Sequence, residues 1–384
     1  KIITSNLYEK PSPGKSLNLS IDLNIQSYAL SRLQNINSKN LNYKEPETGS
    51  VVVMDINTGE LLCCVSSPNF NPNIFSRGIK SKEWKSLTNN KKAPLLNRAV
   101  SGLYSPGSTI KMAVALAALE SGIIGYNNKF FCNGVKEYGD MKFHCWRKYG
   151  HGKINLSQAI ERSCDVFFYE LGLRVGIEKI GVMLKKLGLS TNINLELNEF
   201  RKGLVPSKKW KLDVKGSRWT PGETINASIG QGYMLSNPLE LTTMVARIAN
   251  SDRLVEPTLL SNKKQKFPKL NINKNHLNYI KNAMSDVVNS EFGTAYKSKL
   301  KNRNIKMAGK TGTVQVVRIS EEEREKGIIK NKDREWKKRD HALFVGYAPL
   351  EKPKYSICVI VEHGGSGSTI AAPIAKDVME KLLV

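Results

Sequence analysis

Short runs of apolar residues with strand-like composition predict strands near both ends of the chain. Residues 50–54 and 61–65 are apolar runs of strand-like composition, and the Asn and Gly between them are typical of a hairpin turn. Three further strand-like runs lie at 308–317, 342–347 and 355–361. We therefore expect five strands, of which the first two form an antiparallel hairpin.

Apolar residues at helical spacing predict helices in most of the remaining chain. The stretch from about residue 105 to 300 is mostly helical in pattern, and Ala372 to Leu383 reads as a final amphipathic helix. Between Ile25 and Ile36 apolar residues recur at helical spacing, after an alternating run from Leu17 to Ile21 that predicts a short strand. Strands on both sides of a helical centre indicate an α+β fold, with one antiparallel sheet and helices packed on it.

A polar segment from Asn37 to Thr48 predicts a linker between a leading strand and helix, residues 1–48, and a main body at residues 49–384. With 384 residues and a hydrophobic share of 40%, the chain can bury a sizeable core, which excludes a disordered protein. The longest clean apolar run, Met112 to Leu119, is much shorter than the roughly 18 to 20 residues of a membrane span.

The net charge of +25 is large enough to attract nucleic acid or another acidic polymer. However, the lysines are spread along the whole chain and do not form one basic stripe. No zinc-finger spacing or aromatic-basic RNA signature accompanies the charge. We therefore predict no nucleic-acid partner.

Ser108 and Lys111 are the first candidate chemical pair. Pro106 and Gly107 end a loop and an Ala-rich helical pattern follows, so Ser108 is expected at a helix N-terminus. Lys111 lies nearly one helical turn later, which places its amine on the same face as the Ser108 hydroxyl. If the pair is buried, the amine can lose its charge and accept the serine proton. A Ser-x-x-Lys match is weak by itself, because it recurs by chance in chains of this length.

Two further polar groups lie in largely apolar surroundings. Ser163 and Asp165 interrupt a buried helical pattern, in which such residues are ordinarily unfavourable. The run from Lys310 to Thr313 opens a predicted strand, where the period of two places both threonines on one face and the glycine lets another backbone approach closely. In this order the three groups match the catalytic motifs of serine β-lactamases and penicillin-binding proteins, except that the second motif ends here in Asp and more commonly ends in Asn.

The resemblance extends over essentially the whole chain and is to the monofunctional (class B) penicillin-binding proteins. The Ser-Cys-Asp motif and the Gly-His-Gly segment at 150–152 are similar to those of the penicillin-binding protein 2 group, the cell-elongation transpeptidases, whereas division transpeptidases usually carry Ser-Ser-Asn. The other segments that carry the resemblance are Ser16 to Leu33, Thr58-Gly59-Glu60, Pro94 to Arg98, Pro221 to Thr224, Gly230-Gln231-Gly232, Gly293-Thr294-Ala295 and Asp340 to Pro349.

This resemblance implies a β-lactamase/transpeptidase-like α/β fold: a five-stranded antiparallel sheet with helices on both faces, plus a helical subdomain at about residues 105–300. Residues 49–384 would be the transpeptidase domain. The sequence begins with Lys1 and not Met, and we expect the family's membrane anchor and pedestal domain to lie outside it. The resemblance further implies an inner-membrane protein with its catalytic domain in the periplasm, and elongation-machinery membrane proteins as partners of the anchor and pedestal.

The resemblance also assigns a role to each residue of the first two motifs. Ser108 would attack the penultimate D-Ala carbonyl of a peptidoglycan stem peptide, with Lys111 as base, to form an acyl-enzyme that β-lactams trap. Ser163 would relay the proton to the leaving amine. Asp165 would favour the charged form of Lys111, which complicates its role as a base. No cofactor is expected for catalysis.

The third motif would bind the substrate. The Thr311 and Thr313 hydroxyls, with Gly312 between them and a positive Lys310 nearby, suit the terminal carboxylate of the stem peptide. The backbone N–H groups of Ser108 and Thr313 would bind the developing oxyanion.

Three alternatives share this fold. Glu196 and Asn198 lie near the place of the deacylating Glu of a β-lactamase, but the segment from Glu199 to Trp210 resembles penicillin-binding proteins. A β-lactam sensor domain would usually lack the segment from Ser16 to Leu33. A division-type penicillin-binding protein remains the third alternative.

Cys132, Cys145, His151 and Cys164 form a candidate structural zinc site. Three Cys and one His in a polar stretch of 33 residues match a Cys₃His tetrahedral set, although the spacing is wider than that of a zinc finger. Some proteins that resemble this chain carry Asp at the first two positions, which fits a metal better than a disulfide. His144 is an alternative ligand. A Cys132–Cys145 disulfide is the competing interpretation, because the periplasm is oxidising.

Overall fold

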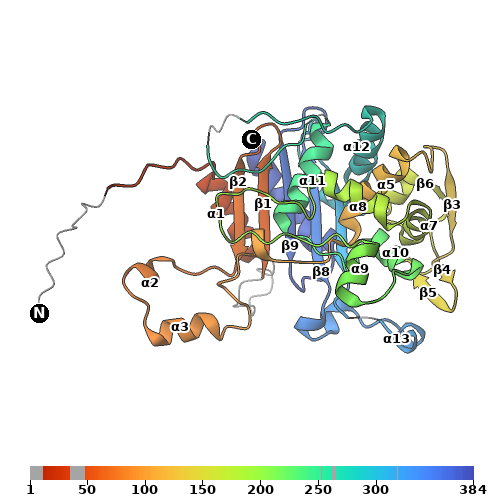
Figure 1. Cartoon of the computed structure of the whole chain (residues 1–384), viewed down its shortest axis with the longest axis horizontal. Helices are drawn as coiled ribbons and strands as arrows, with labels where there is room; N and C mark the ends of the chain where they lie inside the picture. Colours follow the sequence, from red (N-terminus) through yellow and green to blue (C-terminus); the bar gives the residue numbers. More distant parts are fainter. Residues whose placement is uncertain (1–11, 35–47, 252, 262–264, 318) are drawn as a thin grey trace, which may run out of the picture.

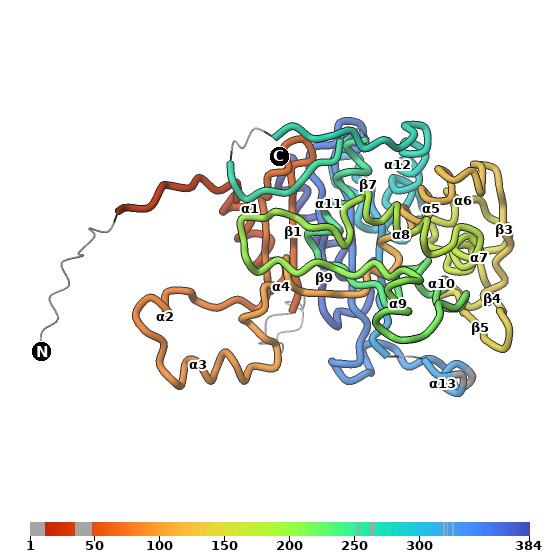
Figure 2. Tube along the Cα trace, in the orientation of Figure 1, coloured from red at the N-terminus to blue at the C-terminus, as the bar shows by residue number. Residues whose placement is uncertain are grey.

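The computed structural model describes residues 12–34, 48–251, 253–261, 265–317 and 319–384 (Figure 1). At its centre lies the predicted five-stranded antiparallel sheet, with strand order β2-β1-β9-β8-β7. The strands are β1 (Gly49–Asp55), β2 (Leu61–Ser67), β7 (Ala308–Val314), β8 (His341–Ala348) and β9 (Tyr355–Val361). The sheet thus joins the two ends of the main body, and β7 lies at one edge (Figure 2).

Helices cover both faces of this sheet, because its central strands are apolar on both sides. Every residue of β9 is buried, as expected for a strand between two helical layers. On one face α11 (Pro238–Asn250) packs on β1, β8 and β9. On the other face α1 (Leu23–Gln34) and α14 (Ala372–Leu382) pack against each other and on the sheet. The predicted fold class is therefore confirmed.

The middle of the chain is mostly helical, as predicted, and lies beside the β7 end of the sheet (Figure 1). Its helices are η1 (Gly107–Ile110), α5 (Lys111–Glu120), α6 (Leu156–Glu161), α7 (Asp165–Val175), α8 (Ile177–Lys186), α9 (Lys208–Lys215), α10 (Pro221–Ser228) and α12 (Lys274–Asn289). It also contains four short strands that the sequence analysis did not predict. They pair as β3 (Lys129–Cys132) with β6 (Gly152–Asn155), and β4 (Val135–Tyr138) with β5 (Met141–His144).

Short elements connect these layers. They are α2 (Asn73–Ser76), α3 (Ser81–Thr88), α4 (Arg98–Ser101), η2 (Tyr296–Ser298), α13 (Glu321–Lys326), η3 (Asn331–Asp333), η4 (Trp336–Lys338) and the π-helical η5 (Gly367–Ala371). The two helices α2 and α3 bury none of their residues and project from the body (Figure 1).

The expected strand from Leu17 to Ile21 is wrong. The segment makes only an isolated bridge between Leu19 and Leu260, and 71% of Leu17 and 58% of Leu19 are exposed. Its backbone hydrogen bonds join Asn18 and Ser20 to Ser261 and Leu259, in a segment that forms no strand, so the pairing does not extend beyond one bridge. The predicted linker lies outside the described residues except for Thr48, as does the end of the helix predicted to reach Ile36.

Candidate active site

Ser108 lies in the 3₁₀ turn η1, which runs directly into α5. The turn packs against β7 and against a second loop, where the Gly107 N–H donates to Gly230 O at 2.9 Å. A Cβ atom on Gly230 would lie 2.2 Å from the Gly107 carbonyl oxygen, so glycine is needed for this close approach. Ser108 is therefore at a helix start as expected, with a 3₁₀ turn before the α-helix.

Lys111 is fully buried, and its amine is directed toward the second motif. Its Nζ donates to Asp165 Oδ1 at 2.7 Å and to Ser163 O at 3.0 Å, and lies 3.4 Å from Ser163 Oγ. Among the described residues no hydrogen bond joins this amine to the Ser108 hydroxyl. Contacts of this kind often close only when a substrate binds. The buried carboxylate partner keeps the amine within the site.

Ser163 and Asp165 lie at a break between two helices. α6 ends at Glu161, Ser163 adopts a left-handed φ of 55°, and Asp165 is the first residue of α7. The sequence analysis placed this motif inside a helical pattern, and the structure corrects that expectation. The break lets both side chains reach Lys111, because the left-handed residue redirects the chain between the helices.

Lys310 is a second buried amine beside Ser163. Its Nζ lies 2.8 Å from Ser163 Oγ and 3.1 Å from Thr311 O. Burial, and then repulsion by Lys111, hold the pKa of Lys310 well below its usual range. Burial therefore makes the charged form of Lys310 less favourable than that of an exposed lysine. The Ser163 hydroxyl lies between two amines, of which Lys111 is paired with a carboxylate and Lys310 has no such pair among the described residues. This arrangement suits proton transfer.

Thr311, Gly312 and Thr313 continue along β7, the edge strand. Thr311 is buried, whereas Thr313 is exposed and its Oγ1 accepts the Gly367 N–H at 3.2 Å. A Cβ atom on Gly312 would lie 3.0 Å from Thr109 Cγ2. Glycine therefore lets the turn that carries the candidate nucleophile pack against the strand that carries the candidate substrate-binding residues.

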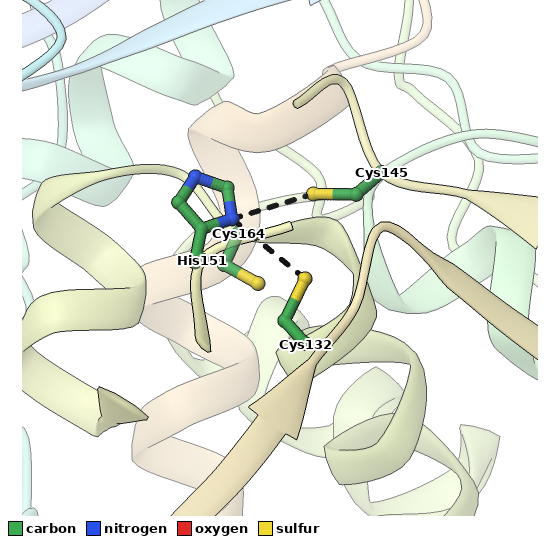
Figure 3. Close-up of side chains that lie close together, drawn as sticks. All are labelled: Cys132, Cys145, His151 and Cys164. Atoms are coloured by element: carbon green, nitrogen blue, oxygen red, sulfur yellow. Dashed lines mark hydrogen bonds between the residues drawn. The ribbon is translucent and has the colours of Figure 1, made fainter. Parts of the chain in front are cut away.

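The four candidate metal ligands, Cys132, Cys145, His151 and Cys164, converge on one point (Figure 3). All their ligand atoms lie within 4.8 Å of one another. His151 Nδ1 is 3.8 Å from the Cys132 sulfur and 3.6 Å from the Cys145 sulfur. The expected alternative ligand His144 instead pairs on its backbone with Val135 in the β4–β5 hairpin, and the cluster does not include its side chain.

These dimensions fit a tetrahedral zinc ion. At the tetrahedral angle, Zn–S bonds of about 2.3 Å and Zn–N bonds of about 2.0 Å place sulfur and nitrogen about 3.5 Å apart. The cysteines of the described chain are all free thiols, with no disulfide between Cys132 and Cys145. Hydrogen bonds from the Cys145 and Cys164 thiols lower the pKa of Cys132 to about 3, so the cluster already favours a thiolate. The donor set is the one zinc prefers.

The cluster contacts the second catalytic motif directly. Cys164 caps α7, because its sulfur accepts the Phe167 N–H at 3.5 Å. The backbone N–H of Trp146, the residue after Cys145, donates to Asp165 Oδ2 at 3.0 Å. Cys164 therefore directly precedes Asp165 in the chain, and Cys145 is linked to Asp165 through the N–H of the next residue, Trp146.

Sequence reasoning missed this contact of Trp146 and a second one at Thr294. The Thr294 hydroxyl lies 2.7 Å from the Thr311 hydroxyl, although Thr294 belongs to a loop that the sequence analysis used only as part of the resemblance. Glu196 does not take the place of a deacylating Glu. Its carboxylate instead accepts hydrogen bonds from the Thr258 hydroxyl and the Leu259 N–H.

Comparison with known proteins decides the family. Residues 49–380 match the family described as "Penicillin binding protein transpeptidase domain". The chain belongs to this family. A crystal structure of Pseudomonas aeruginosa PBP2 in complex with WCK 5153 is 34% identical, with a TM-score of 0.85, and the match covers 97% of this chain and 80% of that one. The PBP2 of Helicobacter pylori in its complex with MreC is 35% identical, with a TM-score of 0.84 and coverage of 96% and 64%.

A curated relative, the peptidoglycan D,D-transpeptidase MrdA of Acinetobacter baumannii, is 37% identical over 380 residues. The match covers 95% of this chain and 54% of the relative. The chain thus spans about half the length of that protein. Within the described part of the chain, no helix has the length and apolarity needed to cross a membrane.

Proposed function

We propose that the chain is the catalytic part of a peptidoglycan D,D-transpeptidase of the cell-elongation type, which cross-links stem peptides through a serine acyl-enzyme. The observation that carries this proposal is the arrangement of Lys111, Lys310 and Asp165 around Ser163, between the Ser108 turn and the edge strand β7. Structures and sequences named PBP2 and MrdA are similar to it at 34–37% identity, which supports elongation over division.

In the proposed first step, Ser108 Oγ forms a bond to the penultimate D-Ala carbonyl carbon. Lys111 takes up the Ser108 proton as it passes one of its own protons through Ser163 to Lys310, a step that requires Lys310 to be in its neutral form. When the peptide C–N bond breaks, Ser163 returns a proton to the departing D-Ala amine. An amine of a second stem peptide then attacks the acyl-enzyme, and Ser108 recovers its proton.

Binding of the substrate follows from the position of β7. An extended peptide can pair with the outer edge of an edge strand through backbone hydrogen bonds. The peptide's terminal carboxylate would then meet the Thr311 and Thr313 hydroxyls, and the Ser108 and Thr313 N–H groups would bind the oxyanion. A β-lactam resembles this substrate and would acylate Ser108 without release.

The intact mass of the protein after incubation with benzylpenicillin tests this function. One equivalent should add to the peptide that carries Ser108, and Ser108→Ala should abolish the addition. Rapid hydrolysis of the drug without a lasting adduct would indicate a β-lactamase, and absence of both would overturn the proposal.

We also propose that Cys132, Cys145, His151 and Cys164 hold a structural zinc ion. The ligand spacing in Figure 3 supports this. The ion would hold Asp165 in place, because Cys164 directly precedes Asp165 and Cys145 directly precedes Trp146, which donates to it.

The cellular setting is part of the same proposal. The H. pylori structure contains PBP2 together with MreC, so elongation-machinery membrane proteins are the partners we expect for the whole protein. An inner-membrane anchor, with this domain in the periplasm, fits a peptidoglycan substrate.

A further inference from the structure

A loop after α12 connects two of the catalytic motifs. The loop consists of residues 290–296 and folds directly onto the end of its own helix, where the Ala295 N–H donates to Val287 O at 2.9 Å. A Cβ atom on Gly293 would lie 2.3 Å from the carbonyl oxygens of Asp286 and Val287, so glycine allows this tight return. The loop therefore has a defined shape next to β7, on which α12 packs.

The loop is anchored on the side of the second motif. The Ser290 hydroxyl donates to the buried carboxylate of Glu161, the last residue of α6. The Arg162 guanidinium lies 4.6 Å from the centre of the Phe292 ring, and the Thr294 N–H donates to Glu161 O at 3.3 Å. The residues that the loop contacts, Arg162 and Glu161, lie one and two positions before Ser163 in the chain.

On its other side the loop reaches the third motif through one side chain. Thr294 Oγ1 lies 2.7 Å from Thr311 Oγ1, and Thr311 is buried on the edge strand. Thr294 is half-buried, with its backbone held by α6 and its hydroxyl in contact with β7. One residue thus joins the end of α6, two residues before Ser163, to the strand that carries Lys310.

The direction of this hydrogen bond determines what Thr311 can bind. A hydroxyl group has a single hydrogen to donate. If Thr311 donates to Thr294, it presents only lone pairs to a ligand and repels a carboxylate. If Thr294 donates, the Thr311 hydrogen is free for the ligand, and a chain of aligned hydroxyls strengthens each bond in it.

We propose that Thr294 is a positioning residue: it donates its hydroxyl hydrogen to Thr311 and so directs the Thr311 hydrogen toward the terminal carboxylate of the stem peptide or β-lactam. This inference rests on the proposed function, in which Thr311 binds that carboxylate. It adds a specificity role to a loop outside the three motifs.

The test compares two ligands that differ only in the carboxylate, benzylpenicillin and its methyl ester. The second-order rate constant of acylation is measured by intact mass for the wild type, Thr294→Val and Thr294→Ser. Valine has the shape of threonine without the hydroxyl. We expect Thr294→Val to acylate about tenfold more slowly with benzylpenicillin. With the methyl ester it should match the wild type within about twofold, and Thr294→Ser should restore the rate with benzylpenicillin.

Ser290→Ala is the matched control, because it removes the anchor to Glu161 and leaves the Thr294 hydroxyl in place. This variant should change the acylation rate constants of both ligands by the same factor. An equal loss for the two ligands in Thr294→Val, or no loss, would overturn the inference while the wild type still forms its adduct. Absence of the wild-type adduct would overturn the proposed function, and this inference with it.

Discussion

Lys310 and Lys111 are buried amines only one hydroxyl apart, and they differ in their partners. Lys111 contacts the Asp165 carboxylate, whereas Lys310 contacts the Ser163 hydroxyl and a backbone carbonyl. This difference gives the two amines separate tasks in the proposed mechanism, one as an anchored partner of the nucleophile and one as a proton acceptor.

The low pKa of Lys310 predicts an unusual pH dependence of acylation. The neutral amine forms as the pH rises through its folded pKa, which lies well below the ordinary value of 10.5. Acylation should therefore rise from acidic pH and reach its plateau before the range in which an exposed lysine titrates. Stopped-flow acylation between pH 5 and 10 measures this profile. Lys310→Ala should acylate more than about tenfold more slowly and lose the rising limb; an unchanged rate would remove Lys310 from the mechanism.

Asp165 predicts a difference between two substitutions. Asp165→Ala leaves the buried Lys111 amine without its 2.7 Å partner and should lower the free energy of unfolding by about 3 kcal/mol. Asp165→Asn keeps an acceptor for Lys111, and we expect a smaller loss and acylation within about tenfold of the wild type. Urea denaturation and acylation rates separate the two variants. Equal stability of both would show that the ion pair does not hold the site together.

At the scale of elements, the sequence predicted what depends on local pattern and missed what depends on pairing. Strands β1, β2, β8 and β9 of the large sheet are largely apolar runs, and β7 shows the alternation typical of a strand. The strands β3 to β6 have only four residues each, which is too short for a clear local pattern. They were missed because they form by pairing with each other next to the cysteine cluster. The break at Ser163 was missed because no Gly or Pro marks it, although its φ is 55°.

The proposed zinc ion should stabilise α7 from its N-terminus, where Cys164 caps the helix. Metal analysis should find about one zinc per chain. Removal by a chelator, or Cys164→Ala, should lower the melting temperature and slow acylation, because Asp165 loses its support from Trp146.

Cys64→Ala is the matched control, since Cys64 is a free, half-buried cysteine of β2 outside the cluster. It should bind the same amount of zinc as the wild type. A metal-free, fully active protein with a Cys132–Cys145 disulfide in its mass map would contradict the zinc proposal.

At the scale of the whole molecule, His341 should make stability depend on pH. Its ring is partly buried beside the ring of His363, and the backbone N–H of His363 donates to His341 Nδ1 at 2.9 Å. Burial, and then the His363 ring, lower the pKa of His341 to about 4. The unfolded chain takes up this proton near pH 6.5, so stability is lost as the pH falls from about 6.5 to 4, by up to about 3 kcal/mol.

His341→Asn keeps an acceptor for the His363 N–H and does not titrate in this range. The difference in unfolding free energy between pH 7.5 and pH 5 should therefore be smaller in this variant than in the wild type, by urea denaturation. The same difference in both proteins would assign the pH dependence to other groups.

The whole-molecule arrangement also shows the limit of motif reasoning. The order of the three motifs indicated which residues belong to the site, and the structure brings Lys111, Ser163 and Lys310 together from separate elements. The contacts of Thr294 and Trp146 join residues 17 and 19 positions apart in the chain through a hydroxyl pair and a backbone N–H. Neither kind of contact has a residue pattern, so the sequence could not reveal them.

The sheet order has a consequence for how the chain folds during synthesis. β1 lies between β2 and β9 (Figure 1), and its Gly49 is paired with Val361 of β9. At about 5–20 residues per second, a ribosome needs roughly 15 to 60 seconds to make the chain between these strands. Throughout that time the apolar hairpin of β1 and β2 has a free edge, which can pair with another chain. Chaperones that bind this nascent hairpin would protect its free edge until β9 is made.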